Sequence, residues 1–218
     1  CMAISVAVCV GKKTAENLKT KLLEEASKLK VGPYTDEKSD FGPLNNKAHY
    51  EKVLGYIDTG EKEGAKLLAD GRNMKLQGYE NGYFVGPTIF DEVKPEMKIY
   101  KEEIFGPVLS MMTTDSYEDA LNLVNDHELG NGAAVFTKSG MIAKHFTENA
   151  KIGMIGVNVP IPVPVAYHSF GGWKRSLFGD HSMHGPEGVR FYTKLKTMTS
   201  RWPSGSRSDP EFVMPTMK

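Results

Sequence analysis

The residues best suited to chemistry lie in one run, Lys101-Glu102-Glu103-Ile104-Phe105-Gly106-Pro107-Val108. Two carboxylates stand beside a β-branched residue and an aromatic residue, and a Gly-Pro pair then leads into the apolar run 108–112. One interpretation is a loop at a strand edge, whose carboxylate accepts hydrogen bonds from sugar hydroxyls while Phe105 packs on a flat ring. The alternative is a solvated acidic turn that enters a strand.

The first residue, Cys1, is the second candidate for chemistry. Its thiol suits three roles: a lipidated terminus, an N-terminal nucleophile that uses its own amine as base, or a nucleophile internal to a longer chain. The alternative is an arbitrary cut through a chain at a buried, inert cysteine. Cys9 lies inside an apolar run, and we interpret it as a core residue.

Two other patterns carry less weight. His168, His181 and His184 invite a metal site, but no clustered cysteines and no second-shell pattern of acidic residues accompany them, so we expect no metal. The run Gly11-Lys12-Lys13-Thr14 resembles the end of a phosphate-binding loop. It lacks the earlier glycine at the required spacing, and we reject that interpretation.

The composition is that of an ordinary soluble protein. Of the 218 residues, 40% are apolar and 25% are charged, enough for a sizeable core. Lys plus Arg and Asp plus Glu number 27 each, which gives no electrostatic reason to expect nucleic acid or an anionic membrane as a partner. No membrane span or signal peptide is visible. Two cysteines make no disulfide framework, which favours a reducing compartment.

Apolar spacing predicts the elements that must position these residues. In the first half it predicts strands at 4–10, 65–69 and 84–90 and helices at 11–30 and 45–64.

In the second half, the spacing predicts strands at 108–113, 133–137 and 153–159. It predicts a helix through residue 125 with Ser116 as its N-cap, and another at 140–150. The alternation of strand and helix indicates an α/β fold, with a mostly parallel sheet and covering helices.

The C-terminal part breaks this alternation. Three prolines at alternate positions exclude a central strand within 160–188, and the aromatic residues there favour an ordered loop. Residues 190–202 alternate polar and apolar side chains and predict a strand. Such a strand needs a partner edge, which we expect from a second chain.

Several motifs now fall in an order that resembles the aldehyde dehydrogenase superfamily. The run 101–108 is similar to that family's nicotinamide-ribose motif, and Cys1-Met2-Ala3 is similar to the segment that begins at its catalytic cysteine. The runs 81–88, 131–137 and 169–172 are similar to further family motifs, in family order. The resemblance covers nearly the whole chain.

Within the superfamily, the runs 156–164 and 176–180 and the tail 213–217 resemble the methylmalonate-semialdehyde dehydrogenases. Together with 170–174 they resemble bacterial members more than animal ones. The resemblance implies oxidation of malonate or methylmalonate semialdehyde with NAD, and transfer of the acyl group to coenzyme A with loss of carbon dioxide. It also implies a homo-oligomer, a dimer or tetramer, in the bacterial cytoplasm or, for a eukaryotic protein, the mitochondrial matrix.

The resemblance assigns roles to four residues. Cys1 matches the thiolate that attacks the aldehyde and carries the resulting thioester. Glu103 matches the carboxylate that holds the hydroxyls of the nicotinamide ribose, and Phe105 matches the aromatic residue beside the nicotinamide. The loop around Phe170 matches a wall of the aldehyde tunnel. The predicted strand 190–202 matches an arm that joins an oligomer sheet.

The resemblance also divides the chain into a catalytic α/β domain, 1–188, and a C-terminal oligomerisation strand and tail, 189–218. The family's dinucleotide-binding half precedes the cysteine and does not fall within these residues. We therefore expect the isolated chain to be inactive. Two alternatives stay open: a non-catalytic fragment or structural module of that enzyme, and an N-terminal-nucleophile hydrolase built on Cys1. The hydrolase predicts stacked antiparallel sheets.

Overall fold

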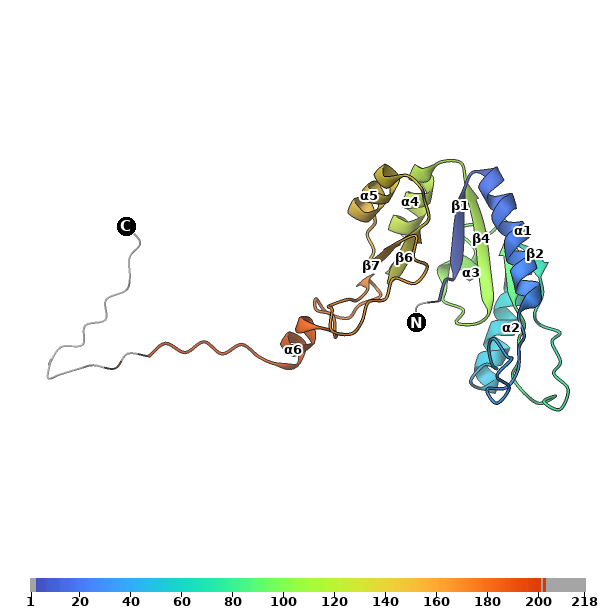
Figure 1. Cartoon of the computed structure of the whole chain (residues 1–218), viewed down its shortest axis with the longest axis horizontal. Coiled ribbons are helices and arrows are strands. Elements are labelled where there is room, and N and C mark those ends of the chain that lie inside the picture. Colours follow the sequence, from blue (N-terminus) through green and yellow to red (C-terminus); the bar gives the residue numbers. More distant parts are fainter. Residues whose placement is uncertain (1–2, 201, 203–218) are drawn as a thin grey trace.

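The structure of the chain is a computed structural model that describes residues 3–200 and 202. Its helices and strands form two groups, and the described residues after α6 extend away from both (Figure 1). The first group contains β1 (Val6–Val10), α1 (Lys12–Lys28), α2 (Lys47–Lys62), β2 (Lys66–Ala69), β3 (Thr88–Asp91), α3 (Lys98–Lys101) and β4 (Val108–Thr114).

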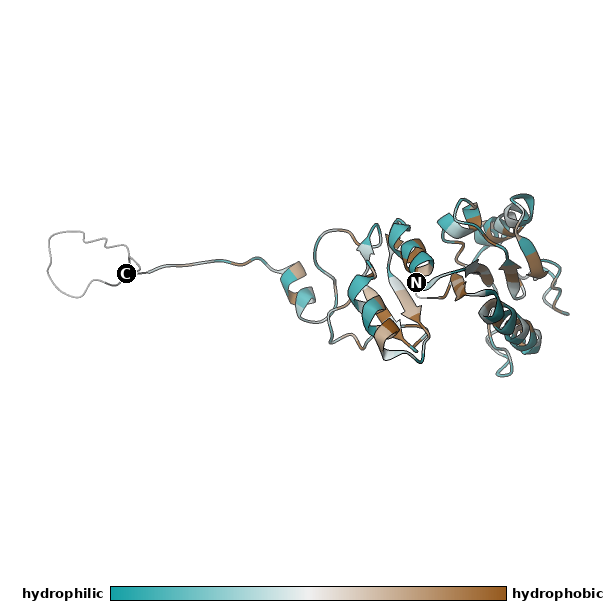
Figure 2. Ribbon diagram, turned by 90° about the horizontal axis from the view of Figure 1, so that it is seen from above, coloured by the Kyte–Doolittle hydropathy of each residue, from teal (hydrophilic) through white to brown (hydrophobic). Residues whose placement is uncertain are grey.

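The first group is a four-stranded sheet in the order β1-β4-β3-β2. Strands β1 and β3 run parallel to β4, and β2 is antiparallel to β3. Helix α1 packs on one face, while α2 and α3 pack on the other. In Figure 2, hydrophobic colour runs along the strands, whereas the helices that cover them carry both hydrophilic and hydrophobic residues.

Alternation along the strands explains why both faces are covered. Phe90 and Met112 point to the α2 side, whereas their neighbours Ile89 and Met111 point to the α1 side. All four side chains are buried. Burial on both faces extends to polar residues of these strands, since Thr88 and Ser110 are also buried.

The second group contains α4 (Tyr117–Asp126), β5 (Leu129–Gly130), β6 (Gly132–Val135), α5 (Gly140–Asn149), β7 (Met154–Val157), β8 (Trp173–Lys174) and α6 (Pro186–Tyr192). Strands β6 and β7 pair in parallel, and β5 pairs antiparallel with β8. Helices α4 and α5 pack on the β6–β7 pair through Leu121 and Phe146. Each of these helices begins with a serine cap, Ser116 and Ser139, whose hydroxyl accepts a backbone N–H three residues on.

The α/β fold with a mostly parallel sheet and covering helices is confirmed. The predicted strands and helices up to residue 159 are present, with bounds that differ from the predicted ones by one to four residues. The described residues form one four-stranded sheet and two strand pairs, not the stacked antiparallel sheets that an N-terminal-nucleophile hydrolase predicts.

The predicted strand at 190–202 is wrong in its first residues. Residues 190–192 belong to α6, which begins with Pro186 at its first position and is supported by an ion pair of Glu187 with Arg190 at 2.7 Å. Residues 193–200 form no helix or strand. Their role as an oligomer arm stays a prediction, as does the domain boundary at 188, which α6 spans.

No helix among the described residues is long and apolar enough to cross a membrane. The tail 213–217, which contributes to the resemblance, lies outside the described residues.

Candidate functional site

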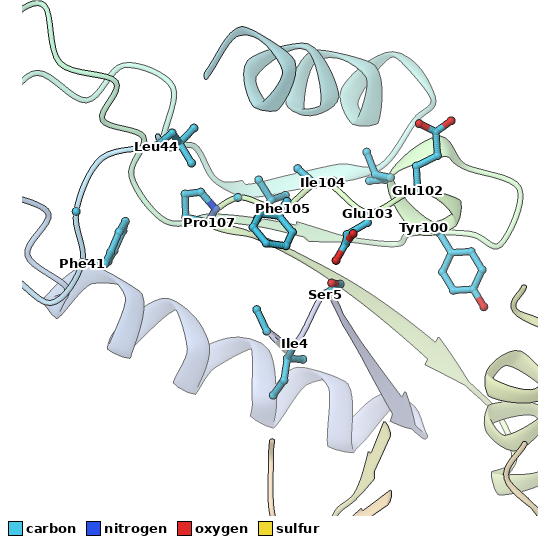
Figure 3. A pocket seen from close by; sticks show the side chains of 15 residues that line it. Ile4, Ser5, Phe41, Leu44, Tyr100, Glu102, Glu103, Ile104, Phe105 and Pro107 are labelled. Atoms are coloured by element: carbon cyan, nitrogen blue, oxygen red, sulfur yellow. The ribbon is translucent and has the colours of Figure 1, made fainter. Parts of the chain in front are cut away.

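A cavity of about 320 Å³ lies where the chain enters β1 and β4. The segment Ala3–Ser5 forms one wall, and the loop before β4 forms the opposite wall with Glu103 and Phe105 (Figure 3). Phe41 and Leu44, from the connection between α1 and α2, close one end. The first described residues of the chain and the acidic run at 101–108, far apart in sequence, therefore meet at one cavity.

The cavity lies at the amino ends of the parallel strands. Ser5 immediately precedes β1, and its carbonyl accepts the backbone N–H of Ser110 in β4 at 3.0 Å. This contact fixes the segment before β1 against β4. Open α/β sheets generally bind ligands at the carboxyl ends of their strands. The position of this site was therefore not predictable from the strand order alone.

The structure separates the two adjacent carboxylates. Glu102 accepts a hydrogen bond from the Tyr56 hydroxyl at 2.5 Å and lies 3.8 Å from the Lys98 ammonium. Glu103 points to the other side of the loop, into the cavity and toward Ser5 (Figure 3). Glu103 has no ion pair or hydrogen bond within the described part of the chain. It is thus the carboxylate free to accept hydrogen bonds from a ligand.

Tyr56 is a proton donor to Glu102 at neutral pH. Burial of the phenol, together with its bond to the carboxylate, raises the pKa of Tyr56 to about 12. Since a carboxylate at that pH only accepts, the hydrogen bond runs from Tyr56 to Glu102.

Phe105 presents its ring to the cavity from an unusual backbone conformation. Its φ is 62°, in the left-handed region, and its side chain is 56% exposed. The Nε2 atom of His49 lies 2.7 Å from the Phe105 carbonyl oxygen, and the two rings meet edge to face at 6.2 Å. Between Glu103 and Phe105, Ile104 is buried in the core and anchors the loop. The loop therefore places one carboxylate and one aromatic face on the same side.

The other predicted site residues lie apart from this cavity or outside the described residues. Cys1 is outside the described residues. Phe170 stacks on His184 at 4.4 Å and does not line the cavity, so its role in an aldehyde tunnel stays a prediction. His181 pairs with Glu187 at 2.7 Å. No group of three or more possible ligands for a metal occurs among the residues that the structure describes.

Sequence reasoning missed His49 and Tyr56. The predicted apolar stripe of the helix at 45–64 contains Tyr50, Val53, Leu54 and Ile57, and it includes neither His49 nor Tyr56. A signal was available: His49 and Tyr56 lie four residues before and three residues after Val53, on the same helix face. What that face contacts could not be known from the sequence.

The comparisons with known proteins agree with this geometry. Residues 1–198 match the aldehyde dehydrogenase family. The chain is 54% identical, over its whole length, to a malonate-semialdehyde dehydrogenase of Pseudomonas aeruginosa and 48% identical to the mitochondrial acylating methylmalonate-semialdehyde/malonate-semialdehyde dehydrogenase of Bos taurus. It spans 44% and 40% of these two proteins.

Solved structures give the same result. The methylmalonate-semialdehyde dehydrogenase of Oceanimonas doudoroffii superposes with a TM-score of 0.91 at 54% identity, over 94% of this chain and 42% of that one. A Sinorhizobium meliloti protein assigned to the same enzyme class, in complex with NAD, gives a TM-score of 0.92 at 56% identity, again over 94% and 42%. The resemblance inferred from the motifs is confirmed, and this chain belongs to the aldehyde dehydrogenase family.

Proposed function

We propose that these residues form the cysteine-bearing part of an NAD-dependent, coenzyme-A-acylating dehydrogenase of malonate or methylmalonate semialdehyde. The relatives from Pseudomonas aeruginosa and Bos taurus carry these substrates in their names, and the bovine one is an acylating enzyme. The identities of 54% and 48% extend over the entire chain, which supports a shared chemistry.

One observation carries the proposal: the segment that follows Cys1 shares a cavity with Glu103 and Phe105. Only Met2 separates Cys1 from Ala3, which lines the cavity. A hydroxyl acceptor and an aromatic face in one small cavity, lined also by the segment that follows a cysteine in sequence, suit a thiol-dependent oxidation.

The residues of the cavity fit the nicotinamide end of NAD. Glu103 is a carboxylate without an internal partner, suited to accept hydrogen bonds from two ribose hydroxyls. Phe105 offers an exposed ring face, and Ile4 and Ile104 add apolar surface. When bound, NAD supplies the acceptor for the hydride of the aldehyde carbon.

Cys1 supplies the covalent step. As a thiolate it attacks the aldehyde carbon to give a thiohemiacetal, and after loss of the hydride and the hydroxyl proton it holds the acyl group as a thioester. The carboxylate of the bound acyl group leaves as carbon dioxide, and the carbon from which it departs takes up a proton. The thiolate of coenzyme A then attacks the thioester carbonyl, and the Cys1 thiolate leaves. Glu103 breaks no bond in this sequence, because it only positions the ribose.

The proposals for location and assembly rest on the motif resemblance. We propose a bacterial cytoplasmic enzyme, because motif similarity favours bacterial members, and a homo-oligomer joined through residues 193–200 and those that follow. Size measurement in solution tests the second statement, and a monomer at micromolar concentration contradicts it.

The experiment uses a hybrid protein, in which these 218 residues replace the matched segment of the Pseudomonas aeruginosa relative. It is incubated with malonate semialdehyde and NAD, with and without coenzyme A, and both NADH and acyl products are measured. We expect the acyl group to appear on coenzyme A. If free acid forms equally fast without coenzyme A, the acylating class is wrong, while the aldehyde dehydrogenase activity stands.

Variants of the hybrid test the two residue roles. Cys1→Ala should abolish NADH formation, since no covalent adduct forms. Glu103→Gln should slow hydride transfer, seen in single-turnover experiments as a slower NADH burst. The matched control is Glu96→Gln, an exposed glutamate away from the cavity, which should change neither rate. Retained activity of the Cys1 variant contradicts the assignment of the nucleophile.

A further inference from the structure

Three residues of α2 face the loop that carries Glu103 and Phe105. His49, Val53 and Tyr56 are spaced by four and three residues, so they lie on one face of the helix. His49 and Val53 meet the loop near its end, at Phe105 and Gly106, and Tyr56 meets it at its beginning, at Glu102.

Val53 makes the closest steric contact. A Cβ atom at Gly106 would lie 2.8 Å from Cγ2 of Val53, nearer than real Cβ contacts come. Val53 is itself fully buried in the core and cannot move aside. The absence of a side chain at Gly106 therefore lets the loop lie directly on α2.

His49 contacts the most strained point of the loop. A positive φ is unfavourable for a bulky residue such as Phe105, and it persists only where the surroundings hold it. The Phe105 carbonyl oxygen can only accept, so His49 donates to it from Nε2. Both the neutral tautomer with the proton on Nε2 and the imidazolium can do so. This bond ties the backbone at Phe105 to the first turn of α2, which Asn46 caps.

Tyr56 sets the orientation of the Glu102 and Glu103 side chains. Its hydroxyl holds Glu102 on the α2 side of the loop, while Glu103 faces the cavity. Since adjacent side chains of an extended segment point to opposite sides, fixing Glu102 also fixes the orientation of Glu103.

We propose that this face of α2 holds the loop 102–106 in its cofactor-binding conformation, with His49 and Tyr56 as positioning residues for Glu103 and Phe105. The part of this inference that concerns the cofactor rests on the proposed function. The part that concerns the loop's conformation rests on the contacts alone. His49 and Tyr56 do not line the cavity, and they act through the loop.

The conformational part is tested on the 218-residue chain by NMR. His49→Ala should shift the Phe105 carbonyl ¹³C resonance upfield, because a hydrogen-bonded carbonyl is deshielded. It should also raise exchange of the Val108 amide, which bonds to Gly106 O next to the loop, by roughly fivefold, the factor expected for one lost hydrogen bond. His49→Gln, whose amide also donates, should restore both values.

The control is His145→Ala, because His145 bonds to Tyr117 at 2.9 Å in the second group of elements. It should leave the Phe105 carbonyl resonance and the Val108 exchange rate unchanged. If His49→Ala also leaves both unchanged, or if His49→Gln behaves like His49→Ala, the positioning role of His49 is wrong.

The functional part is tested in the hybrid protein. His49→Ala and Tyr56→Phe should raise KM for NAD about fivefold each with a smaller change in kcat, and His49→Gln should recover most of the loss. An unchanged KM for NAD overturns the link between α2 and the cofactor. A parent hybrid that forms no NADH at all instead contradicts the proposed function, and the NMR result still decides the conformational part.

Discussion

Two regions of the molecule bury their apolar side chains to very different extents. In residues 3–114, the four-stranded sheet is covered on both faces, and Phe90 and Ile57 have no exposed surface. In residues 157–202, large apolar side chains meet solvent: Phe178 is 94% exposed, Leu195 97% and Trp202 88%. Both regions have ordinary apolar composition, so the difference lies in the partners available within this chain.

The contrast shows which features are formed entirely by elements within one region. The cavity with Glu103 and Phe105 belongs to the first region, where each contacting element lies within the same 112 residues, 3–114. Most of the exposed large apolar side chains among the described residues lie in the second region. The chain spans less than half the length of the two curated relatives reported above.

The largest expected effect concerns whether the first region is enough for catalysis. We expect the 218-residue chain to form NADH at least about 10³-fold more slowly than the hybrid protein. Glu103 and Phe105 reach only the nicotinamide end, and no Gly-x-Gly-x-x-Gly run that could seat a pyrophosphate occurs in the sequence. Spectrophotometric assay of both proteins at equal concentration checks this. Comparable rates would show that the self-contained region also binds the dinucleotide.

The second effect compares the stability of the two regions directly. Phe90→Ala should lower the free energy of unfolding by about 3–5 kcal/mol, because it leaves a cavity between the sheet and α2. Leu195→Ala should change it by less than about 0.5 kcal/mol, since that side chain makes almost no contact. Urea unfolding of the chain measures both. A cost for Leu195→Ala above about 1 kcal/mol would show that the Leu195 side chain is packed against other residues in solution.

The same contrast explains how much of the fold was predictable. Helices α1 and α2 and strands β1 and β4 bury one or two faces within the chain, and burial is what hydrophobic periodicity reports. In residues 190–202 the periodicity predicted a strand. The residues just before this range favour a helix, because α6 begins with a proline and contains a Glu187–Arg190 ion pair. These local signals decide the conformation of the first three residues.

The candidate site was only partly predictable. Residue chemistry selected the run 101–108, and the family resemblance selected Glu103 over Glu102. The physical reason for that choice is a hydrogen bond from Tyr56, 46 residues away in sequence. The bond from His49 to Phe105 spans 56 residues. Contacts of such separation depend on how α2 crosses the sheet, which no local pattern encodes.

A third prediction probes the close approach of the loop to α2. Gly106→Ala should destabilise the chain by about 1–3 kcal/mol, because the added methyl group overlaps the Val53 side chain. Val53→Ala should relieve part of that cost, so the double variant should be less destabilised than the sum of the two by about 1 kcal/mol.

The matched glycine lies in the second group of elements. Gly140 is the first residue of α5 and has nothing within 4 Å of its would-be Cβ atom. Gly140→Ala should be neutral or slightly stabilising, since alanine has less freedom in the unfolded chain. Strict additivity of Gly106→Ala and Val53→Ala in urea unfolding would contradict the steric account.

The smallest effect concerns Tyr56 and pH. Burial, followed by the bond to Glu102, raises the pKa of Tyr56 to about 12 in the folded chain, above the ordinary value of about 10. Below about pH 10 the phenol is protonated in both states, and its contribution to stability is complete. Between about pH 10 and 12 the unfolded chain loses this proton first, so the free energy of unfolding falls as pH rises.

Tyr56→Phe should cost about 1 kcal/mol at pH 8 through the lost hydrogen bond and should flatten the decline above pH 10. The control is Tyr167→Phe in the second region, where the ring is 69% exposed and the variant should follow the parent profile. The difference between parent and Tyr56→Phe across this pH range isolates the Tyr56–Glu102 bond from the other groups that titrate there. If that difference is constant from pH 8 to 12, Tyr56 does not donate to Glu102, and the orientation of Glu103 must have another cause.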